Sequence, residues 1–251
     1  MKDTTRQLGL GTWISIGAPV ITEMASQFAF DWLLFDLEHG SMQESSLISN
    51  LQAIRRKEVK AIVRVGSLHP AQICRVLDWG AAGIMMPHVN TPEKAASCIQ
   101  AMRYPPYGHR GFSGGARAYN YGLNRPQDPA KVEAPIFIAQ IEDEEGVENA
   151  HKIAAVDGVH ALFIGPSDLK HALSVSTGKT VPGYEVALKK VCNAAIENNR
   201  QAGILIQDPV DLAALKPFGF SCFAIKSDIG ILLSGYRQII RESEDSASRI
   251  E

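Results

Sequence analysis

The sequence is poor in cysteine and has no excess of charge of either sign. Only 4 cysteines occur in 251 residues, and none of them forms a CxxC pair. Widely spaced cysteines inside apolar stretches are typical of reduced, packed thiols in a cytosolic protein, which argues against a disulfide framework. With 25 basic and 27 acidic residues the net charge is −2, so no overall field favours nucleic acid as a partner. A small-molecule ligand is expected instead.

Long apolar segments are absent as well. No apolar run approaches the length of a membrane span, and the N-terminus lacks a basic region followed by an apolar one. We therefore expect a cytoplasmic protein with no membrane partner. The 251 residues, 45% of them hydrophobic, match the size of one α/β barrel with few insertions, so a single domain over residues 1–251 is expected.

Eight short apolar runs are each followed by a segment with helical spacing. This alternation predicts strand and helix units around a buried parallel sheet. Eight strands favour a closed (β/α)₈ TIM barrel over an open sheet. The expected strands are 8–13, 32–37, 61–65, 83–86, 136–141, 161–164, 203–206 and 222–225, and the expected outer helices include 71–79, 92–102, 147–155 and 184–199.

Residues 103–132 interrupt this rhythm with a segment rich in glycine, proline, arginine and tyrosine. Long loops of mixed aromatic and basic composition are usually functional, so we interpret this one as a flexible lid near the site. Its Arg110 and Arg117 either bind a second substrate carboxylate or, the favoured alternative, face solvent. The polar residues 243–251 are expected to fray.

Candidate site residues are the polar side chains that end the predicted strands. In a barrel, the loops that follow the strands form one shared mouth, so these side chains converge there. The set comprises Asp36, Glu38, His39, Arg64, Gln140, Glu142, Ser167 and Asp168.

Glu142 and Asp168 form the strongest chemical signal. Taken singly, Asp168 fits a helix N-cap and Glu142 fits a salt bridge with a loop arginine. Together they are two carboxylates on neighbouring strands with no histidine or cysteine ligand nearby, which suits Mg²⁺ or Mn²⁺ with open coordination positions. Such an ion can chelate a 2-oxo acid and polarise its ketone toward an enolate.

Other mouth residues offer complementary chemistry. Arg64 can stabilise an enolate oxygen or form a structural pair with Asp36, and the two roles are compatible. His39 can act as a base, although a lone histidine is more often structural. The N–H groups of Ser167 and Asp168, at a helix start, can bind a carboxylate. The other six histidines have weaker claims and are interpreted as surface or capping residues.

Five segments together resemble the HpcH/HpaI aldolase/citrate lyase family: FDLEHG, VRVGSLHPAQICRVLDWGAAGIMMPHV, RYPPYGHRGF, AQIEDEEGVEN and FIGPSDL. The likeness is greatest to its metal-dependent class II pyruvate aldolases. It implies a (β/α)₈ barrel, a homo-hexamer with C-terminal helices exchanged between subunits, and Mg²⁺, Mn²⁺ or Co²⁺ held by Glu142 and Asp168.

The resemblance also implies a role for each site residue. His39 becomes the acid/base residue with Asp78 as its orienting partner, and Arg64 becomes the enolate stabiliser. The remaining implied roles are pyruvate contacts by Gln140, backbone N–H donation by Ser167 and Asp168, and fixing of Arg64 and His39 by Asp36.

The implied activity is reversible cleavage of a 4-hydroxy-2-oxo acid to pyruvate and an aldehyde through a pyruvate enolate, with oxaloacetate decarboxylation through the same enolate. Three alternatives stay open. One is a decarboxylase that forms carbon–carbon bonds in biosynthesis, like the relative macrophomate synthase. The second is a Schiff-base aldolase using Lys226, where family members commonly have glycine. The third is an inactive barrel that serves as a binding or assembly protein. Gly40 and Ser41 replace Ala and Pro of the best-known family aldolases, which leaves the acceptor aldehyde open.

Overall fold

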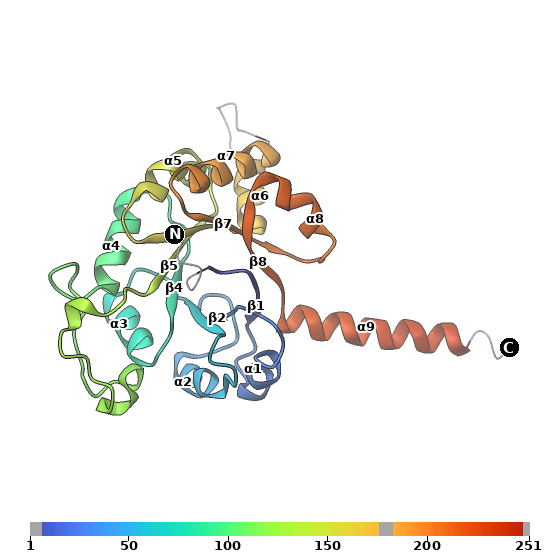
Figure 1. Ribbon diagram of the computed structural model, residues 1–251. Coiled ribbons are helices and arrows are strands. Elements are labelled where there is room, and N and C mark those ends of the chain that lie inside the picture. Colours follow the sequence, from blue (N-terminus) through green and yellow to red (C-terminus); the bar gives the residue numbers. More distant parts are fainter. Residues whose placement is uncertain (1–6, 176–182, 248–251) are drawn as a thin grey trace.

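The computed structural model describes residues 7–175 and 183–247. Eight parallel strands close into a barrel in sequence order, with helices around it (Figure 1). The predicted (β/α)₈ TIM barrel is thereby confirmed. The strands are β1 (Leu10–Ile14), β2 (Trp32–Asp36), β3 (Lys60–Arg64), β4 (Gly83–Met86), β5 (Ile136–Ile141), β6 (Val159–Ile164), β7 (Gln201–Ile206) and β8 (Phe220–Ser227).

Strand alternation divides the apolar side chains between two cores. Trp32, Leu34 and Ile62 belong to a cluster inside the barrel, whereas Leu33 and Phe35 pack in the larger cluster between strands and helices. Because most residues of the strands are buried on both faces of the sheet, the strands read as nearly continuous apolar runs, which made them predictable.

Several outer helices begin at a proline, at a capping side chain or at both. Thr91, for example, precedes Pro92 and accepts a hydrogen bond from the Lys94 N–H. Asp143 caps α5 in the same way, so that helix starts before the expected residue 147. The helices are α1 (Pro19–Ala25), α2 (Glu44–Ala53), α3 (Pro70–Asp78), α4 (Pro92–Met102), α5 (Glu144–Ala155), α6 (Pro166–Val175), α7 (Tyr184–Glu197), α8 (Asp211–Leu215) and α9 (Asp228–Ala247), with 3₁₀ turns η2 (Arg117–Gly122), η3 (Pro129–Lys131) and η4 (Lys216–Phe218).

The expected cysteine chemistry is also seen. All four thiols are free, and those of Cys98, Cys192 and Cys222 are buried. Burial raises the pKa of Cys98 and of Cys192 to about 12, which makes these thiols unreactive packing groups.

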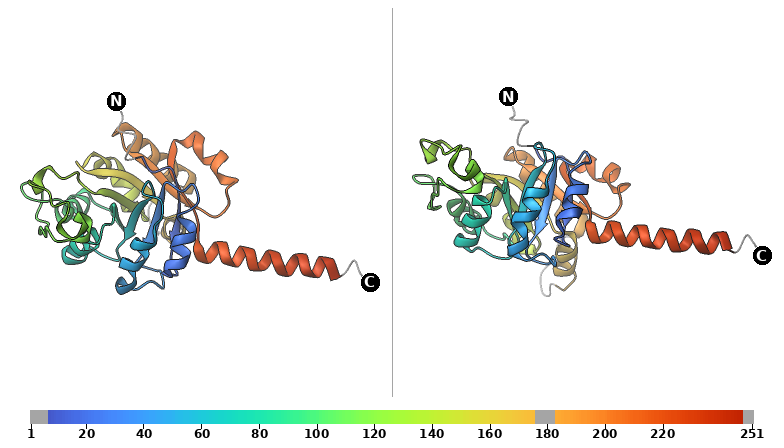
Figure 2. Two further views of the ribbon diagram at one scale, coloured as in Figure 1. Left: turned by 60° about the horizontal axis from the view of Figure 1, so that its bottom comes forward. Right: turned by 90° about the horizontal axis from the view of Figure 1, so that it is seen from below.

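The loop 103–132 is not a lid over the mouth of its own barrel. It joins α4 to β5, so it lies at the amino ends of the strands, and Figure 2 (right) shows it at the end of the barrel opposite the start of α9. Arg110 is buried, donates to Asp78 at 2.6 Å and stacks on Tyr104, while Arg117 donates to the Trp79 carbonyl. The expectation that these arginines face solvent is therefore wrong for Arg110.

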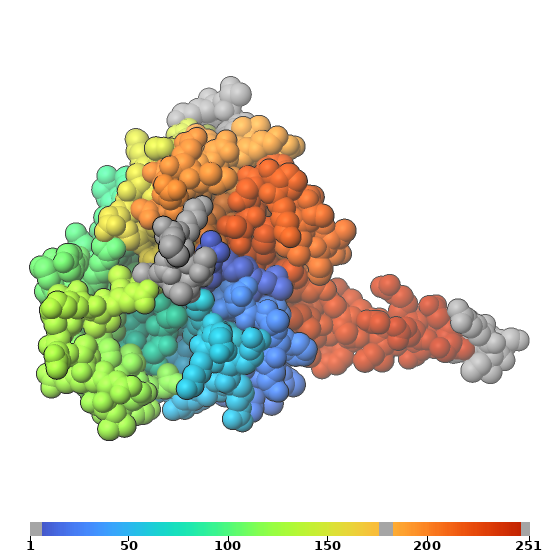
Figure 3. All heavy atoms as spheres, viewed as in Figure 1, coloured from blue at the N-terminus to red at the C-terminus, as the bar shows by residue number. Residues whose placement is uncertain are grey.

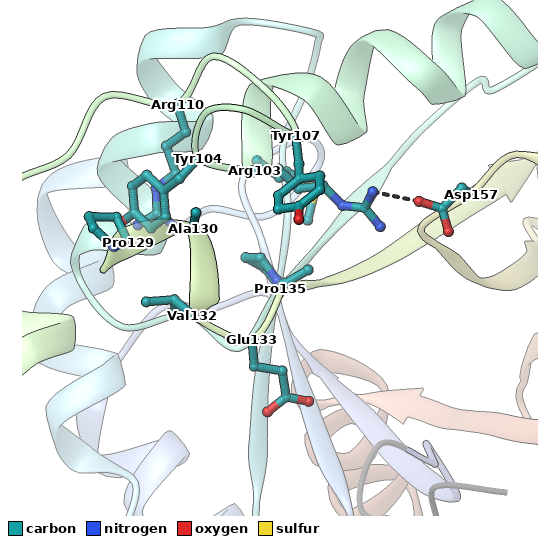
Figure 4. A pocket seen from close by; sticks show the side chains of 12 residues that line it. Arg103, Tyr104, Tyr107, Arg110, Pro129, Ala130, Val132, Glu133, Pro135 and Asp157 are labelled. Carbon is teal, nitrogen blue, oxygen red and sulfur yellow. Dashed lines mark hydrogen bonds and ion pairs between the residues drawn. The ribbon is translucent and has the colours of Figure 1, made fainter. Parts of the chain in front are cut away.

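A pocket of about 300 Å³ lies under this loop. Figure 4 shows its lining side chains, among them Tyr104, Tyr107 and the Arg103–Asp157 ion pair. It is at the end of the barrel away from the mouth, so it is not the predicted site.

Helix α9 extends away from the barrel (Figures 1 and 3). Its root is fixed by buried Asp228, whose carboxylate accepts the N–H groups of Ser15 and Ile16, both at 3.0 Å. The fraying expected for residues 243–251 is not seen as far as Ala247, where the helix ends; residues 248–251 are outside the described part. Across the described ranges, no helix is both long enough and apolar enough for a bilayer crossing.

Candidate active site

The candidate site lies where the strands end. Asp36 and Arg64 are the last residues of β2 and β3, Glu142 directly follows β5, and Asp168 is in the first turn of α6. Because all strands are parallel, these positions share one rim of the barrel. The sequence-based placement of these residues at one mouth agrees with the structure.

Arg64 is a buried anchor of the site. It donates to both oxygens of Asp36, at 2.9 and 2.7 Å, and its Nη1 lies 2.9 Å from Glu38 Oε2. Its guanidinium also stacks on the Trp13 ring at 4.3 Å. Asp36 further accepts the N–H groups of Glu38 and His39, at 3.1 and 3.3 Å. The structural pair with Asp36 is thus present, and it fixes the turn that carries His39.

The Glu142 carboxylate is held on both oxygens. Oε2 accepts the His88 backbone N–H at 3.0 Å, and Oε1 accepts the Gln140 amide at 2.7 Å. A Cβ at Gly165 would lie 2.3 Å from Oε1, so only glycine leaves room for this position. Glu142 is therefore anchored by its own strand and the β4–α4 turn, not by an arginine of the 103–132 loop.

The electrostatics around Glu142 favour a cation. Burial raises its pKa, and the nearby carboxylates of Asp168 and Glu38 act in the same direction, opposed by the hydrogen bond and charge of His88. The buried Gln140 Oε1 finds no hydrogen-bond donor within the described part of the chain. Crowded carboxylate oxygens beside an unused amide oxygen fit a hard divalent ion with its bound water.

The side chains of the chain supply only part of the ligands that such a metal ion needs. Within residues 7–175 and 183–247, no three or more His, Cys, Asp or Glu side chains are arranged to hold a metal. Two carboxylates would thus leave positions for substrate and water, as catalytic rather than structural metal sites do.

His39 and Asp78 are not brought together within one chain. His39 is 68% exposed at the mouth, with Nε2 3.9 Å from Glu38 Oε2. Asp78 ends α3, which runs back from the mouth to the amino ends of the strands, and it pairs there with Arg110. An intrachain His39–Asp78 pair therefore does not exist in this structure.

Two further predicted groups can be placed. The first intrahelical hydrogen bond of α6 runs from the Leu169 N–H to the Gly165 carbonyl, so the N–H groups of Ser167 and Asp168 precede the helical ladder. Lys226 has a positive φ of 55°, and its Nζ donates to Ser234 of α9 at 3.0 Å. The lysine thus contacts the root of α9.

The sequence interpretation missed His88. This residue was interpreted as a surface or capping residue, yet its Nδ1 lies 3.3 Å from Glu142 Oε2. The available signal was its position two residues after β4, close to the strand-end criterion that selected the other residues. Glu38 was among the mouth residues but received no role, and it lies between Arg64 and both histidines.

Comparison with known proteins agrees with this geometry. The family model described as HpcH/HpaI aldolase/citrate lyase matches residues 9–226. The chain belongs to this family. It is 32% identical over 234 residues to 5-keto-4-deoxy-D-glucarate aldolase of Escherichia coli ATCC 8739, covering 93% of this chain and 91% of that one. The family resemblance noted above is thus confirmed, and the chain is an enzyme of the lyase type.

Solved structures of the family share the fold. An HpcH/HpaI aldolase/citrate lyase family protein from Burkholderia cenocepacia J2315 has a TM-score of 0.87 at 30% identity, covering 97% of this chain and 96% of that chain. Macrophomate synthase has a TM-score of 0.84 at 27% identity, covering 99% and 88%. Both structures match this chain over nearly its whole length.

Proposed function

We propose that this family member is a class II pyruvate aldolase that reversibly cleaves a 4-hydroxy-2-oxo acid to pyruvate and an aldehyde through a pyruvate enolate. The observation that carries this proposal is the position of Glu142 and Asp168 on one rim of the barrel, where burial raises the Glu142 pKa and the Asp168 carboxylate adds to that effect. Glu142 and Asp168 would hold Mg²⁺, Mn²⁺ or Co²⁺, which when bound supplies a Lewis acid for the ketone of the oxo acid.

Residues of the chain would bind and orient the oxo acid. The N–H groups of Ser167 and Asp168 would receive its carboxylate at the start of α6. Gln140 would contact the bound pyruvate. Arg64, locked by Asp36, would place a permanent positive charge near the enolate oxygen as charge develops there.

His39 would move the proton of the aldol hydroxyl. Its exposure at the mouth supports access to substrate, and Asp36 fixes its backbone N–H. If Asp78 orients His39, the carboxylate has to come from a second copy of the chain, because the two residues of one chain lie at opposite ends of the barrel.

The proposed assembly is a homo-hexamer with exchanged C-terminal helices. The support is the apolar surface of α9, on which Ile239 and Ile240 are each 60% exposed and Tyr236 is 61% exposed. A protruding helix with such a surface is typical of one that packs against a partner.

A second candidate activity is decarboxylation of oxaloacetate coupled to carbon–carbon bond formation. The similarity to macrophomate synthase favours it, since a decarboxylase and an aldolase can share one enolate. A Schiff-base mechanism at Lys226 is less supported, because the Lys226 Nζ is engaged by Ser234.

The direct test is an assay of metal-stripped protein on oxaloacetate and on 4-hydroxy-2-oxo acids, repeated after adding back Mg²⁺, Mn²⁺ or Co²⁺. We expect activity to vanish with EDTA and to return with an added ion, and product analysis to separate cleavage from decarboxylation. Full activity in EDTA, together with borohydride trapping of substrate on Lys226, would overturn the proposal.

A further inference from the structure

His88 is held at the mouth in an unusual backbone conformation. It follows β4 with a φ of +51°, a left-handed conformation that is uncommon for residues other than glycine. Its N–H is bonded to Glu142, and its carbonyl accepts the Lys94 ammonium at 2.8 Å. Asn149 holds the same turn through the Asn90 carbonyl. Non-glycine residues fixed in such conformations cluster at functional sites. The contacts of the His88 side chain are therefore a place to look for a function.

The His88 ring faces two carboxylates. Its Nδ1 lies 3.3 Å from Glu142 Oε2, and its Nε2 lies 3.8 Å from Glu38 Oε1, while 55% of the side chain remains exposed. The second oxygen of Glu38 forms an ion pair with Arg64 Nη1 at 2.9 Å, without a hydrogen bond of good geometry. A separation of 3.8 Å is too long for a direct hydrogen bond, but one oxygen atom can contact both groups.

A hydroxyl group matches this pair. The imidazole can donate a hydrogen bond and the Glu38 carboxylate can accept one, and a hydroxyl is both an acceptor and a donor. An aldehyde without such a group would leave the mostly buried Glu38 oxygen without this partner, and a site that binds a substrate hydroxyl discriminates strongly against an analogue lacking it.

The position of His88 suits the acceptor aldehyde. Around the rim, the turn that carries His88 follows β4, between Arg64 at the end of β3 and Glu142 after β5. The enolate would lie between Arg64 and the carboxylates, and an attacking aldehyde carbon approaches it to about 3–3.5 Å. The α-substituent of that aldehyde is then within reach of the rim at β4.

We propose that His88 and Glu38 form a subsite for the α-hydroxyl group of the acceptor aldehyde, so that His88 is a specificity-determining residue. The inference rests on the proposed aldolase function. In the aldol direction, a bond forms between the pyruvate methyl carbon, which has lost one proton, and the aldehyde carbon, whose oxygen takes up one proton. The subsite acts on the α-hydroxyl and leaves this proton balance unchanged.

The test compares glycolaldehyde with propanal, two acceptors of equal size that differ in the α-hydroxyl. For wild type, His88→Gly and His88→Asn, the ratio of kcat/KM for glycolaldehyde to kcat/KM for propanal is measured with pyruvate and Mn²⁺. Glycine and asparagine both tolerate the left-handed backbone and keep the N–H that binds Glu142, and asparagine keeps a side-chain donor. A ratio within each variant cancels a general loss of activity, which a purely structural role would cause.

We expect wild type to prefer glycolaldehyde at least tenfold, His88→Gly to lose that preference, and His88→Asn to recover part of it. An unchanged ratio in His88→Gly, or no preference in wild type, would overturn the subsite. If His88→Gly has no measurable turnover, the ratio of His88→Asn decides: a ratio clearly below that of wild type supports the subsite, and an unchanged ratio contradicts it. Failure of the aldolase function itself would appear separately, as absence of metal-dependent exchange of the pyruvate methyl hydrogens by wild type in D₂O.

Discussion

At the residue scale, the geometry of the site depends on the groups that fix the position of the Glu142 carboxylate. Its two oxygens accept hydrogen bonds from the His88 N–H and the Gln140 amide, and Gly165 lies against it without a side chain. Two fixed hydrogen bonds leave the carboxylate little freedom to reorient. The position of this one side chain is therefore the most sensitive part of the site.

Replacing Gly165 by alanine should displace Glu142. The new Cβ would lie 2.3 Å from Oε1, a distance that forces the carboxylate to move. We expect Mn²⁺ affinity to fall at least tenfold, or about 1.4 kcal/mol, in a titration followed by electron paramagnetic resonance. Gly111→Ala is the matched control, because a Cβ there meets nothing within 4 Å. Equal Mn²⁺ affinity in the two variants would contradict this role of Gly165.

Removing Asp36 should unfold the protein more readily. Asp36→Ala leaves the buried Arg64 guanidinium without its bidentate partner, a loss of about 3 kcal/mol in the free energy of unfolding. Urea denaturation measures it. Glu148→Ala on the exposed side of α5 should cost less than about 0.5 kcal/mol. A similar loss in both variants would mean that the Arg64–Asp36 pair adds nothing to stability.

At the scale of elements, the sequence was a good guide to which segments form strands. It was a poorer guide to where the loops lie on the barrel. The eight strands were recognisable because most of their residues are buried and apolar on both faces of the sheet. Loop 103–132 was expected near the site from its composition, although a segment that joins α4 to β5 has to lie at the amino ends of the strands. The same connectivity places Asp78, at the end of α3, away from His39.

The C-terminal helix is another element that the sequence pattern did not predict. The polar residues 243–251 were expected to fray, but α9 continues to Ala247 with an exposed apolar surface. Within the part of the chain that the structure describes, Ile239 and Ile240 are each 60% exposed, and the proposed assembly would cover them.

Charged substitutions on α9 should break the proposed assembly. Ile239→Glu combined with Ile240→Glu places two charges on the apolar surface, and we expect a smaller oligomer in analytical ultracentrifugation. Gln238→Glu is the control, since it adds a charge on the same helix at an exposed polar position. The assembly proposal fails if the double variant sediments like wild type as a large oligomer, or if wild type is a monomer.

At the scale of the whole molecule, the carboxylates link metal binding to pH. Burial and like charges raise the Glu142 pKa above its ordinary 4.5, so the folded metal-free protein disfavours the charged form. A raised carboxyl pKa stabilises the folded state at low pH, and this contribution is lost as the pH rises through the folded value. A bound cation offsets the free-energy cost of the charged Glu142 side chain, because the cation binds the deprotonated carboxylate.

The increase in Tm produced by saturating Mn²⁺ should therefore grow as the pH is raised from about 4.5 toward 7. Thermal unfolding at several pH values, with and without Mn²⁺, measures it. In Glu142→Gln the increase should be small at every pH. A Tm gain in wild type that is constant over this range would show that Glu142 does not control binding.

We propose above all that Glu142 and Asp168 together hold one divalent ion. Titration of metal-free wild type, Glu142→Gln and Asp168→Asn with Mn²⁺, followed by electron paramagnetic resonance, tests it most directly. Wild type should bind one ion per chain, and each variant should bind at least tenfold more weakly while keeping the circular dichroism of the folded barrel. Binding of Mn²⁺ by both variants with the affinity of wild type would contradict the account.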